Sequence, residues 1–284
     1  MPSETEFGQL FVVATPIGNL ADMVPRAVET LQTVDLIAAE DTRHSAKLLS
    51  HFSISTPMFA YHDHTDERRT ELLIEKLRAG SKVALISDAG TPLISDPGYR
   101  LVAEARRQGI TVTPIPGACA LITALSASGL ATDRFRFEGF LPSKQQARQQ
   151  RLQSLVEETA TLVYYEAPHR ILDCLQDVAS VFGMERRVVL ARELTKTFET
   201  FLAGNVAQVL ARVAEDSNQQ RGEIVLMIAG AAAVTAEIDA ESRRLLALLL
   251  PHMPPKKAAG VVAEYTGLKK NALYQWLMQQ KAGE

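Results

Sequence analysis

Short apolar runs alternate along most of the chain with longer segments in which apolar residues recur every three or four positions. The short runs predict strands, and the longer segments predict amphipathic helices. The strands predicted in the first part of the chain are residues 10–14, 36–39, 83–86 and 111–115. The helices predicted between them are residues 25–33, 42–51, 66–78 and 98–108. This alternation is typical of a largely parallel sheet covered by helices.

The alternation restarts after the turn Pro114-Ile-Pro-Gly117. The elements predicted there are a helix at 118–128, strands at 135–140, 162–165, 188–191 and 223–228, and a further strand at 198–202. An alanine-rich connector precedes three predicted helices at 237–250, 255–266 and 269–280. We therefore expect an α/β fold with an N-terminal α/β domain (1–117), a second α/β domain (118–234) and a helical, basic C-terminal element (235–284).

Composition excludes several protein classes. The length of 284 residues fits about two domains. Hydrophobic residues at 46% and charged residues at 22% exclude a disordered or fibrous chain. Cys119 and Cys174 lie far apart, so neither a disulfide framework nor a zinc site is expected, and a reducing cytoplasm is the default location. The acidic N-terminus does not resemble a secretory signal, and no apolar run reaches the ~18 residues that span a bilayer.

The formal net charge of −3 does not favour nucleic-acid binding by the chain as a whole. Two segments are nevertheless basic. Residues 134–151 carry Arg134, Arg136, Lys144, Arg148 and Arg151 against Glu138 alone, and the C-terminal element carries Lys256, Lys257, Lys269, Lys270 and Lys281. Such patches are candidate phosphate contacts, although a solvated helix face is the plainer alternative for each.

Two loops after predicted strands are candidates for a small-molecule site. They are Ala14-Thr-Pro-Ile-Gly-Asn-Leu20 and Ser87-Asp-Ala-Gly-Thr-Pro-Leu-Ile-Ser-Asp-Pro-Gly98. Open α/β sheets bind ligands beyond the carboxyl ends of their strands, and glycine lets the backbone approach a ligand. Asp88 could accept hydrogen bonds from ribose hydroxyls or an amino group, or it could simply cap a helix in an ordinary turn.

Other chemistry has little support. The sequence contains no Gly-x-Gly-x-x-Gly motif, no phosphate-binding loop that ends in Gly-Lys-Ser/Thr, and no Gly-x-Ser-x-Gly elbow. His62, Asp63, His64 and Asp66 form a cluster that could in principle bind a metal. These side chains could equally be solvated on a loop, and we expect no metal.

Six blocks in one order carry a family resemblance. They are Ala14-Thr-Pro-Ile-Gly-Asn-Leu20, Ala39-Glu-Asp-Thr-Arg-His44, Ser87 to Gly98, Ile115-Pro-Gly-Ala118, Tyr164-Tyr-Glu-Ala-Pro-His-Arg170 and Gly222-Glu-Ile-Val225. Together they closely resemble the RsmI-type ribosomal RNA small-subunit methyltransferases of the tetrapyrrole methylase superfamily, over nearly the whole chain. The resemblance implies two α/β domains with S-adenosylmethionine in the cleft between them, a homodimer, and no metal.

The resemblance also implies roles for particular positions. Those that match the family's cofactor site are Pro16, Ile17, Asp88, Ala89, Gly90, Thr91, Cys119, Ala120, Tyr165, Glu166, Glu223 and Ile224. The chain departs from the superfamily in having Thr-Pro-Ile in place of repeated glycines in the first loop, and Cys119 where serine is usual. The resemblance also implies that backbone groups at Glu223 and Ile224 hold the adenine.

The reaction that the resemblance implies is methylation of the ribose 2′-hydroxyl of a cytidine in the decoding centre of 16S rRNA in the small ribosomal subunit. Candidate bases for the hydroxyl proton are Glu40, Asp41, His44 and His62. Candidate RNA contacts are Arg43, Lys144, Arg148, Arg151, Arg170, Lys256, Lys257, Lys269 and Lys270. Alternatives are an internal ion-pair network around Glu40 and Arg43, and a tail hairpin that serves dimerisation.

Two other functions stay open at this point. The chain could methylate a small corrinoid or porphyrin, which the basic tail disfavours. It could also be a non-catalytic RNA-binding protein that keeps the cleft as a scaffold, because a fold does not by itself imply an activity.

Overall fold

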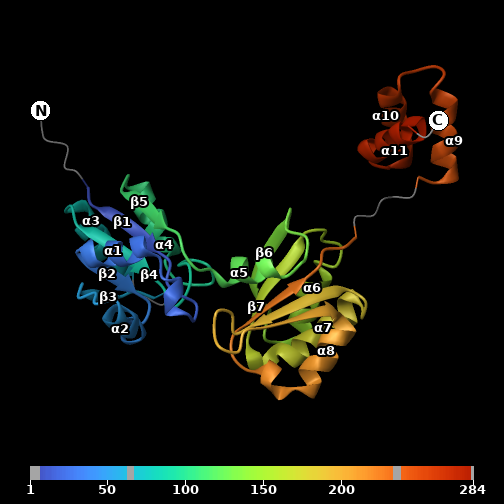
Figure 1. Ribbon diagram of the computed structural model, residues 1–284. Coiled ribbons are helices and arrows are strands. Elements are labelled where there is room, and N and C mark those ends of the chain that lie inside the picture. Colours follow the sequence, from blue (N-terminus) through green and yellow to red (C-terminus); the bar gives the residue numbers. More distant parts are fainter. Residues whose placement is uncertain (1–6, 63–66, 233–237, 283–284) are drawn as a thin grey trace, which may run out of the picture. The chain divides into compact units, whose positions relative to one another are not determined.

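The computed structural model describes residues 7–62, 67–232 and 238–282. Within these residues the backbone forms two five-stranded sheets with helices, and three further helices near the C-terminus (Figure 1). The chain divides into two compact units, Met1–Gly230 with both sheets and Ala231–Glu284 with the last helices. The α/β fold is confirmed, while a domain boundary near residue 117, inside the first unit, stays a prediction.

The first sheet is parallel throughout, with the strand order β3-β2-β4-β1-β5. Its strands are β1 (Gln9–Val13), β2 (Leu36–Ala39), β3 (Met58–Ala60), β4 (Lys82–Ile86) and β5 (Thr111–Ile115). Its helices are α1 (Pro25–Thr33), α2 (Thr42–His51), α3 (Glu67–Arg78) and α4 (Tyr99–Arg107). Because all the strands run the same way, the loops after β1, β2, β4 and β5 meet at one edge of the sheet.

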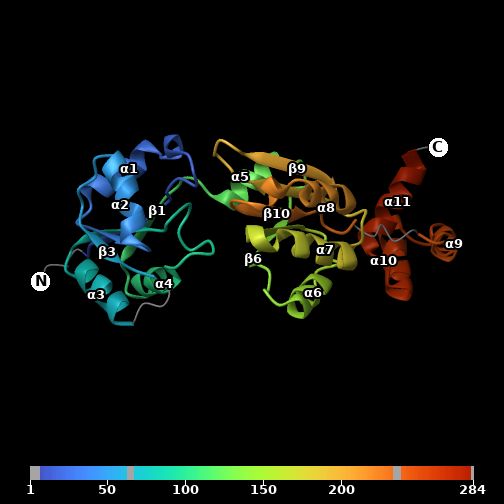
Figure 2. The same ribbon diagram turned by 90° about the horizontal axis from the view of Figure 1, so that it is seen from below.

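Helices cover both faces of the first sheet (Figure 2). Side chains of α1 and α2 pack with Ile37 and Ile86 on one face, and side chains of α3 and α4 pack with Leu10 and Leu85 on the other. This double burial explains why β4 reads as a continuous apolar run and not as an alternating pattern. The strand β3 was not predicted, because three half-buried residues at a sheet edge produce no periodic signal.

The second sheet is mixed, with the order β6-β7-β10-β8-β9. Its strands are β6 (Phe135–Phe140), β7 (Thr161–Glu166), β8 (Arg187–Arg192), β9 (Thr200–Asn205) and β10 (Ile224–Ile228). The strands β6 and β7 are parallel, and the other pairs are antiparallel. Its helices are α5 (Ala120–Ala127), α6 (Gln145–Gln153), α7 (Ile171–Phe182) and α8 (Val206–Glu215).

The two faces of the second sheet have different neighbours. Residues of α6, α7 and α8 pack on the face that carries Leu162, Tyr164 and Leu226. The opposite face, with Val163 and Val225, packs on α5 and on residues of the loops that follow β1 and β4. One face therefore forms an ordinary core, and the other meets the edge of the first sheet where a ligand site is expected.

The C-terminal unit contains α9 (Ala240–Leu249), α10 (Pro255–Thr266) and α11 (Lys270–Ala282). These helices share a small core of their own, which includes Leu246, Val262 and Leu273. Gly267 ends α10 in the left-handed conformation (φ 74°), which produces the tight turn before α11. None of the helices in the described residues combines the length and apolarity that a membrane crossing requires.

Candidate functional site

A cavity of about 350 Å³ lies where the loops after β1 and β4 face the second sheet. This volume is within the ~300–1,000 Å³ range of small-molecule sites. Among the predicted cofactor residues, all except Pro16 and Asp88 line the cavity, namely Ile17, Ala89, Gly90, Thr91, Cys119, Ala120, Tyr165, Glu166, Glu223 and Ile224. Both sheets therefore contribute residues to one cavity, in agreement with the cleft that the family resemblance implies.

Backbone contacts hold the first-sheet loops against each other. Thr15 and Gly90 exchange two hydrogen bonds, with N to O distances of 2.9 and 3.0 Å. The Thr91 hydroxyl donates to the Ala118 carbonyl at 3.0 Å, which ties the loop after β4 to the start of the second half of the unit. Gly90 has a φ of +80°, and a Cβ there would lie 3.2 Å from Ile17 Cγ2. Only glycine supplies this conformation and space without strain.

Asp88 lies behind the cavity wall, outside the lining residues. Its Oδ1 accepts a hydrogen bond from the Asp41 amide at 3.1 Å, and its own amide donates to Glu40 Oε2 at 3.4 Å. The structure thus brings Asp88 together with two of the candidate bases, Glu40 and Asp41. The side chain of Asp88 braces the loop after β2, and a direct cofactor contact by Asp88 stays a prediction.

The four candidate bases differ in their surroundings, and none of them lines the cavity. Asp41 caps α2 by accepting from the Arg43 amide at 2.8 Å and forms an ion pair with Arg43 Nη2 at 3.3 Å. The hydrogen bond from Arg43 lowers the pKa of Asp41, which makes it a weaker base. His44 and His62 have exposed side chains. The Arg43 side chain is 91% exposed, so its pair with Asp41 lies at the surface and is not the internal ion-pair network considered as an alternative.

The possible metal cluster is tested only in part. His62 is within the described residues, whereas Asp63, His64 and Asp66 lie outside them. Across the part of the chain that the structure describes, no three His, Cys, Asp or Glu side chains are grouped as a metal site requires.

Aromatic side chains of the second sheet form one wall of the cavity. The Tyr165 hydroxyl accepts a hydrogen bond from the Leu121 amide at 3.2 Å, which connects β7 to the first turn of α5. Burial raises the pKa of Tyr165 above its ordinary value, so the phenol stays neutral over the physiological range. The ring of Phe137 meets the Tyr165 ring edge-on, at 4.9 Å between centroids. Tyr165 therefore contributes a neutral aromatic surface to the cavity.

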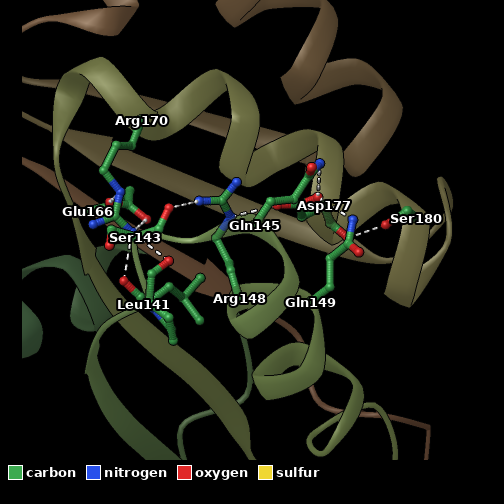
Figure 3. A network of polar contacts seen from close by, with 10 residues as sticks. Leu141, Ser143, Gln145, Arg148, Gln149, Glu166, Arg170, Asp177 and Ser180 are labelled. Atoms are coloured by element: carbon green, nitrogen blue, oxygen red, sulfur yellow. Dashed lines mark hydrogen bonds and ion pairs between the residues drawn. The ribbon is translucent and has the colours of Figure 1, made fainter.

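Glu166 and Arg170 hold the end of β7 in place (Figure 3). The Glu166 side chain is fully buried, and its Oε1 accepts from the Ala167 amide at 2.7 Å and lies 3.2 Å from Arg170 Nε. Arg170 Nη2 also donates to the carbonyls of Leu141 (2.6 Å) and Pro142 (3.2 Å). Arg170 therefore fixes the segment after β6, and these internal contacts do not support its predicted role in phosphate binding.

Arg148 was predicted to contact RNA, but the structure places its side chain in the interior. Only 4% of its side chain is exposed, and its Nε donates to Asp177 Oδ2 at 2.6 Å (Figure 3). The prediction treated the 143–151 segment as a basic outer face, but the helix turns this arginine inward onto α7. Arg151 is 43% exposed and paired with Glu138, while Lys144 is exposed. Of the predicted contacts in this segment, Lys144 and Arg151 can reach solvent.

The loop after β8 forms another part of the cavity wall. Leu194 lines the cavity, and the Glu193 carboxylate accepts from the Glu223 amide at 3.0 Å and from Lys196 Nζ at 2.8 Å. Partial burial raises the pKa of Glu193, but the hydrogen bonds from Lys196 and the Glu223 amide outweigh it, so the net pKa lies below the ordinary value. Thr195 Oγ1 accepts from the Asn19 amide at 3.1 Å, which joins this loop to the loop after β1.

Several lining residues were not predicted. They are Ile94, Ser95, Asp96, Phe140, Ala167, Pro168, Leu194, Gly222 and Val225. Asp96 lies in a loop that the sequence had singled out, and its carboxyl group next to a proline-glycine turn was an available signal. The sequence around Leu194 and Phe140 gave no such signal. Their positions depend on where the strands β8 and β6 end, which only the pairing of the second sheet determines.

Two family models match the chain. The model described as Tetrapyrrole (Corrin/Porphyrin) Methylases matches residues 9–210, and the model described as RsmI C-terminal HTH domain matches residues 236–281. A protein of Pseudomonas aeruginosa named "Ribosomal RNA small subunit methyltransferase I" is 57% identical over 276 residues, 96% of this chain and 98% of that protein. The protein of the same name from Escherichia coli O157:H7 is 54% identical over 274 residues, 96% of each chain.

Solved structures with a similar fold have distant sequences. The methyltransferase CobJ superposes with a TM-score of 0.58 at 16% identity, covering 79% of this chain and 95% of its own. A uroporphyrin-III C-methyltransferase from Thermus thermophilus, in complex with S-adenosylhomocysteine, gives a TM-score of 0.53 at 17% identity, covering 78% and 97%. At this level of identity the likeness concerns the fold alone.

Proposed function

Because this chain belongs to the tetrapyrrole methylase family, and within it to the ribosomal RNA small-subunit methyltransferases I, we propose that it 2′-O-methylates the ribose of a cytidine in 16S rRNA. It is an S-adenosylmethionine-dependent rRNA methyltransferase. The proposed target is in the decoding centre of the small subunit, at the P site. One observation carries the proposal: the cavity and the basic tail occur together in a chain that its relatives match almost end to end.

The residues of the cavity fit S-adenosylmethionine. The apolar side chains of Ile17, Leu194 and Val225 suit an adenine ring, and the carboxylate of Asp96 suits hydroxyl or amino groups. Gly90 lines the cavity without a Cβ, so a ligand can approach its backbone. We therefore propose that the predicted residues which line this cavity hold the cofactor.

S-adenosylmethionine supplies a methyl group that its sulfonium charge already activates. What the chain must add is placement, because holding two reactants in line can contribute ~7–11 kcal/mol to lowering a barrier. The carboxylates of Glu166 and Glu223 are already paired with Arg170 and Lys196. Pairing limits their attraction for a sulfonium, which would otherwise stabilise the ground state and slow transfer.

A base near the 2′-hydroxyl would assist the transfer by removing its proton. Glu40 is the candidate that the geometry favours, because its carboxylate lies beside the Asp88 amide, one residue from the lining residue Ala89. His44 and His62 stay alternatives, and the lowered pKa of Asp41 disfavours that residue. A Glu40→Gln variant should bind the cofactor normally and lose methyl transfer.

The C-terminal element is proposed to contact the phosphates of the rRNA. The side chains of Lys256, Lys257, Lys269 and Lys270 are exposed near the first turns of α10 and α11. Lysines placed in this way bind phosphates without reading bases, which suits a large structured RNA. Arg43, Lys144 and Arg151 are further proposed contacts. Because its proposed substrate is the small ribosomal subunit, we propose that the enzyme acts in the cytoplasm. The homodimer that the resemblance implies stays a prediction, which analytical ultracentrifugation can test.

The proposal is tested with purified protein, labelled S-adenosylmethionine and small ribosomal subunits. We expect label in 16S rRNA and, after digestion to nucleosides, 2′-O-methylcytidine by mass spectrometry. Methyl transfer to a free corrinoid or porphyrin instead would favour the small-molecule alternative. Absence of heat on titration with S-adenosylmethionine would favour a non-catalytic RNA-binding protein. Detection of a cytidine methylated on the base would still identify an rRNA methyltransferase, but it would show that the ribose is not the methylated group.

A further inference from the structure

Phe140 combines two properties that point to a role in ligand binding. It lines the cavity, and 56% of its surface is exposed. A large apolar side chain that faces both a ligand site and solvent marks a position at the mouth of that site, where a partner can cover it. The cofactor residues Ile17 and Ile224 are buried and form the floor.

A bulge in β6 places Phe140 on this side of the sheet. Phe137 pairs with Val163 of β7, Gly139 pairs with Tyr164, and Phe140 pairs with Tyr165, so Glu138 is an extra residue. Side chains alternate between faces along a strand, so Phe140, three residues after Phe137, would face the opposite side in a regular strand. The extra residue shifts the alternation by one and returns Phe140 to the cavity face.

The bulge is held by specific interactions. Gly139 has a φ of +66°, a conformation that costs energy for any residue with a Cβ. The Glu138 side chain is only 5% exposed and forms ion pairs with Arg136 and Arg151. These contacts keep the extra residue in place, so the position of Phe140 is built into the strand.

The ring of Phe140 is only partly covered. Its centroid lies 5.9 Å from that of Tyr165, at an interplanar angle of 68°. Because 56% of the residue is exposed, part of its surface remains accessible to a ligand. Ser95, an exposed lining residue, lies beside the same strand, because a Cβ on Gly139 would be 3.8 Å from the Ser95 hydroxyl. A planar group that enters the cavity mouth would therefore pass over Phe140.

We propose that Phe140 is a stacking platform for the base of the nucleotide whose ribose receives the methyl group. This inference rests on the proposed function, because a base must leave its own stack in the rRNA to reach the platform. Aromatic side chains are the usual partners of unstacked bases in RNA recognition. The Phe140 ring orients the nucleotide and so sets the distance between its 2′-hydroxyl and the methyl group.

The first test compares substitutions at Phe140 by methyl transfer to small subunits and by calorimetry with S-adenosylmethionine. Phe140→Ala should lower kcat/KM for the subunit by roughly 5- to 150-fold, the range expected for one lost base–aromatic stack. Phe140→Leu should be almost as impaired, because it keeps an apolar side chain without a ring face. Phe140→Tyr and Phe140→Trp should retain most activity. All four should bind the cofactor within about threefold of wild type.

The control is Phe135→Ala, on the same strand. Phe135 is 43% exposed and is not among the lining residues. This variant should keep wild-type transfer. If Phe140→Leu is as active as Phe140→Tyr, or if cofactor affinity falls as far as transfer does, the ring is part of the cofactor wall and the proposal is wrong.

A second readout detects stacking without turnover. Trp276 is the only tryptophan, so a Trp276→Phe, Phe140→Trp double variant reports on position 140 alone. With S-adenosylhomocysteine present, a short oligocytidine RNA should quench its fluorescence and should not quench the matched Trp276→Phe, Phe135→Trp protein. Equal quenching, or none at position 140, rejects the platform. Wild-type protein that methylates no rRNA rejects the proposed function itself, which is a separate outcome.

Discussion

Replacement of Arg148 should reduce stability and leave RNA binding intact. Arg148 of α6 and Asp177 of α7 are both almost fully buried, with side-chain exposures of 4% and 2%, and their ion pair has a distance of 2.6 Å. The Asp177 carboxylate also accepts from the amides of Gln145 at 3.1 Å and Gln149 at 2.6 Å (Figure 3). The pair therefore connects two helices on one face of the second sheet, away from solvent.

Removal of one partner from a buried ion pair costs about 3–5 kcal/mol. In Arg148→Ala the Asp177 carboxylate keeps the donors from Gln145 and Gln149, so we expect a loss near the lower limit. For a unit of this size each kcal/mol lowers Tm by roughly 2–4 °C, which gives a decrease of about 6–12 °C. Asp177→Ala should cost more, because it leaves a buried guanidinium that keeps the Ser143 carbonyl, a neutral acceptor, at 3.2 Å. The apolar double variant Arg148→Met, Asp177→Leu should regain most of the loss.

Thermal unfolding by circular dichroism and filter binding to 16S rRNA at 20 °C separate the two roles of this helix. The matched control is Lys144→Ala, which removes the exposed cation just before α6. Lys144→Ala should weaken RNA binding and leave Tm unchanged. Arg148→Ala should lower Tm and leave RNA binding unchanged. An Arg148→Ala protein that melts like wild type and binds RNA as weakly as Lys144→Ala would refute the structural role.

Three further predictions concern other parts of the chain. Deletion of residues 235–284 should weaken binding to small subunits and keep cofactor affinity by calorimetry, because the tail is a separate compact unit; equal loss of both would reject this division. Gly139→Ala should reduce rRNA methylation by straining the bulge, while Gly183→Ala, also at a positive φ (+84°) but with no neighbour within 4 Å, should lose stability alone. The pKa of Glu193 is lower in the folded protein than its ordinary value of 4.5, so the ionised carboxylate stabilises the fold above about pH 4.5. This stabilisation disappears as the pH falls through the pKa of the folded state, so the Tm values of wild type and Glu193→Gln should differ at pH 6 and converge in acid. A Tm difference that does not change with pH would contradict the lowered pKa.

The elements were predictable wherever local pattern and burial agree. Helix α1 begins at a proline and α2 at an aspartate cap, and both match their predicted bounds. The strand β9 was predicted two residues early, because apolar Phe198 is exposed in the preceding loop. For the site, the loop that contains Gly90 and Thr91 was found from its place after a strand, since parallel topology gathers such loops at one edge. The resemblance then singled out the two residues.

Charge was the least reliable guide to function. A cationic residue in a basic segment looks the same in sequence whether it meets phosphate or a buried carboxylate. Arg148, in a basic segment, and Arg170, in a block that carries the family resemblance and lies outside such a segment, were both candidate RNA contacts, and both have internal partners. Lys144, only four residues before Arg148, is exposed. The difference depends on which side of α6 faces α7, and a nine-residue helix with arginine and glutamine on most sides has too weak an apolar stripe to reveal this.

The sequence by itself determined the α/β class, the parallel first sheet, the glycine-containing loops at its carboxyl edge and the helical tail, because each of these depends on local periodicity and turn chemistry. Only the tertiary structure decided which residues share the cavity, which arginines are neutralised inside, and which face of β6 presents Phe140. One inserted residue in a strand reverses that face, and its presence becomes visible only when the neighbouring strand supplies the register.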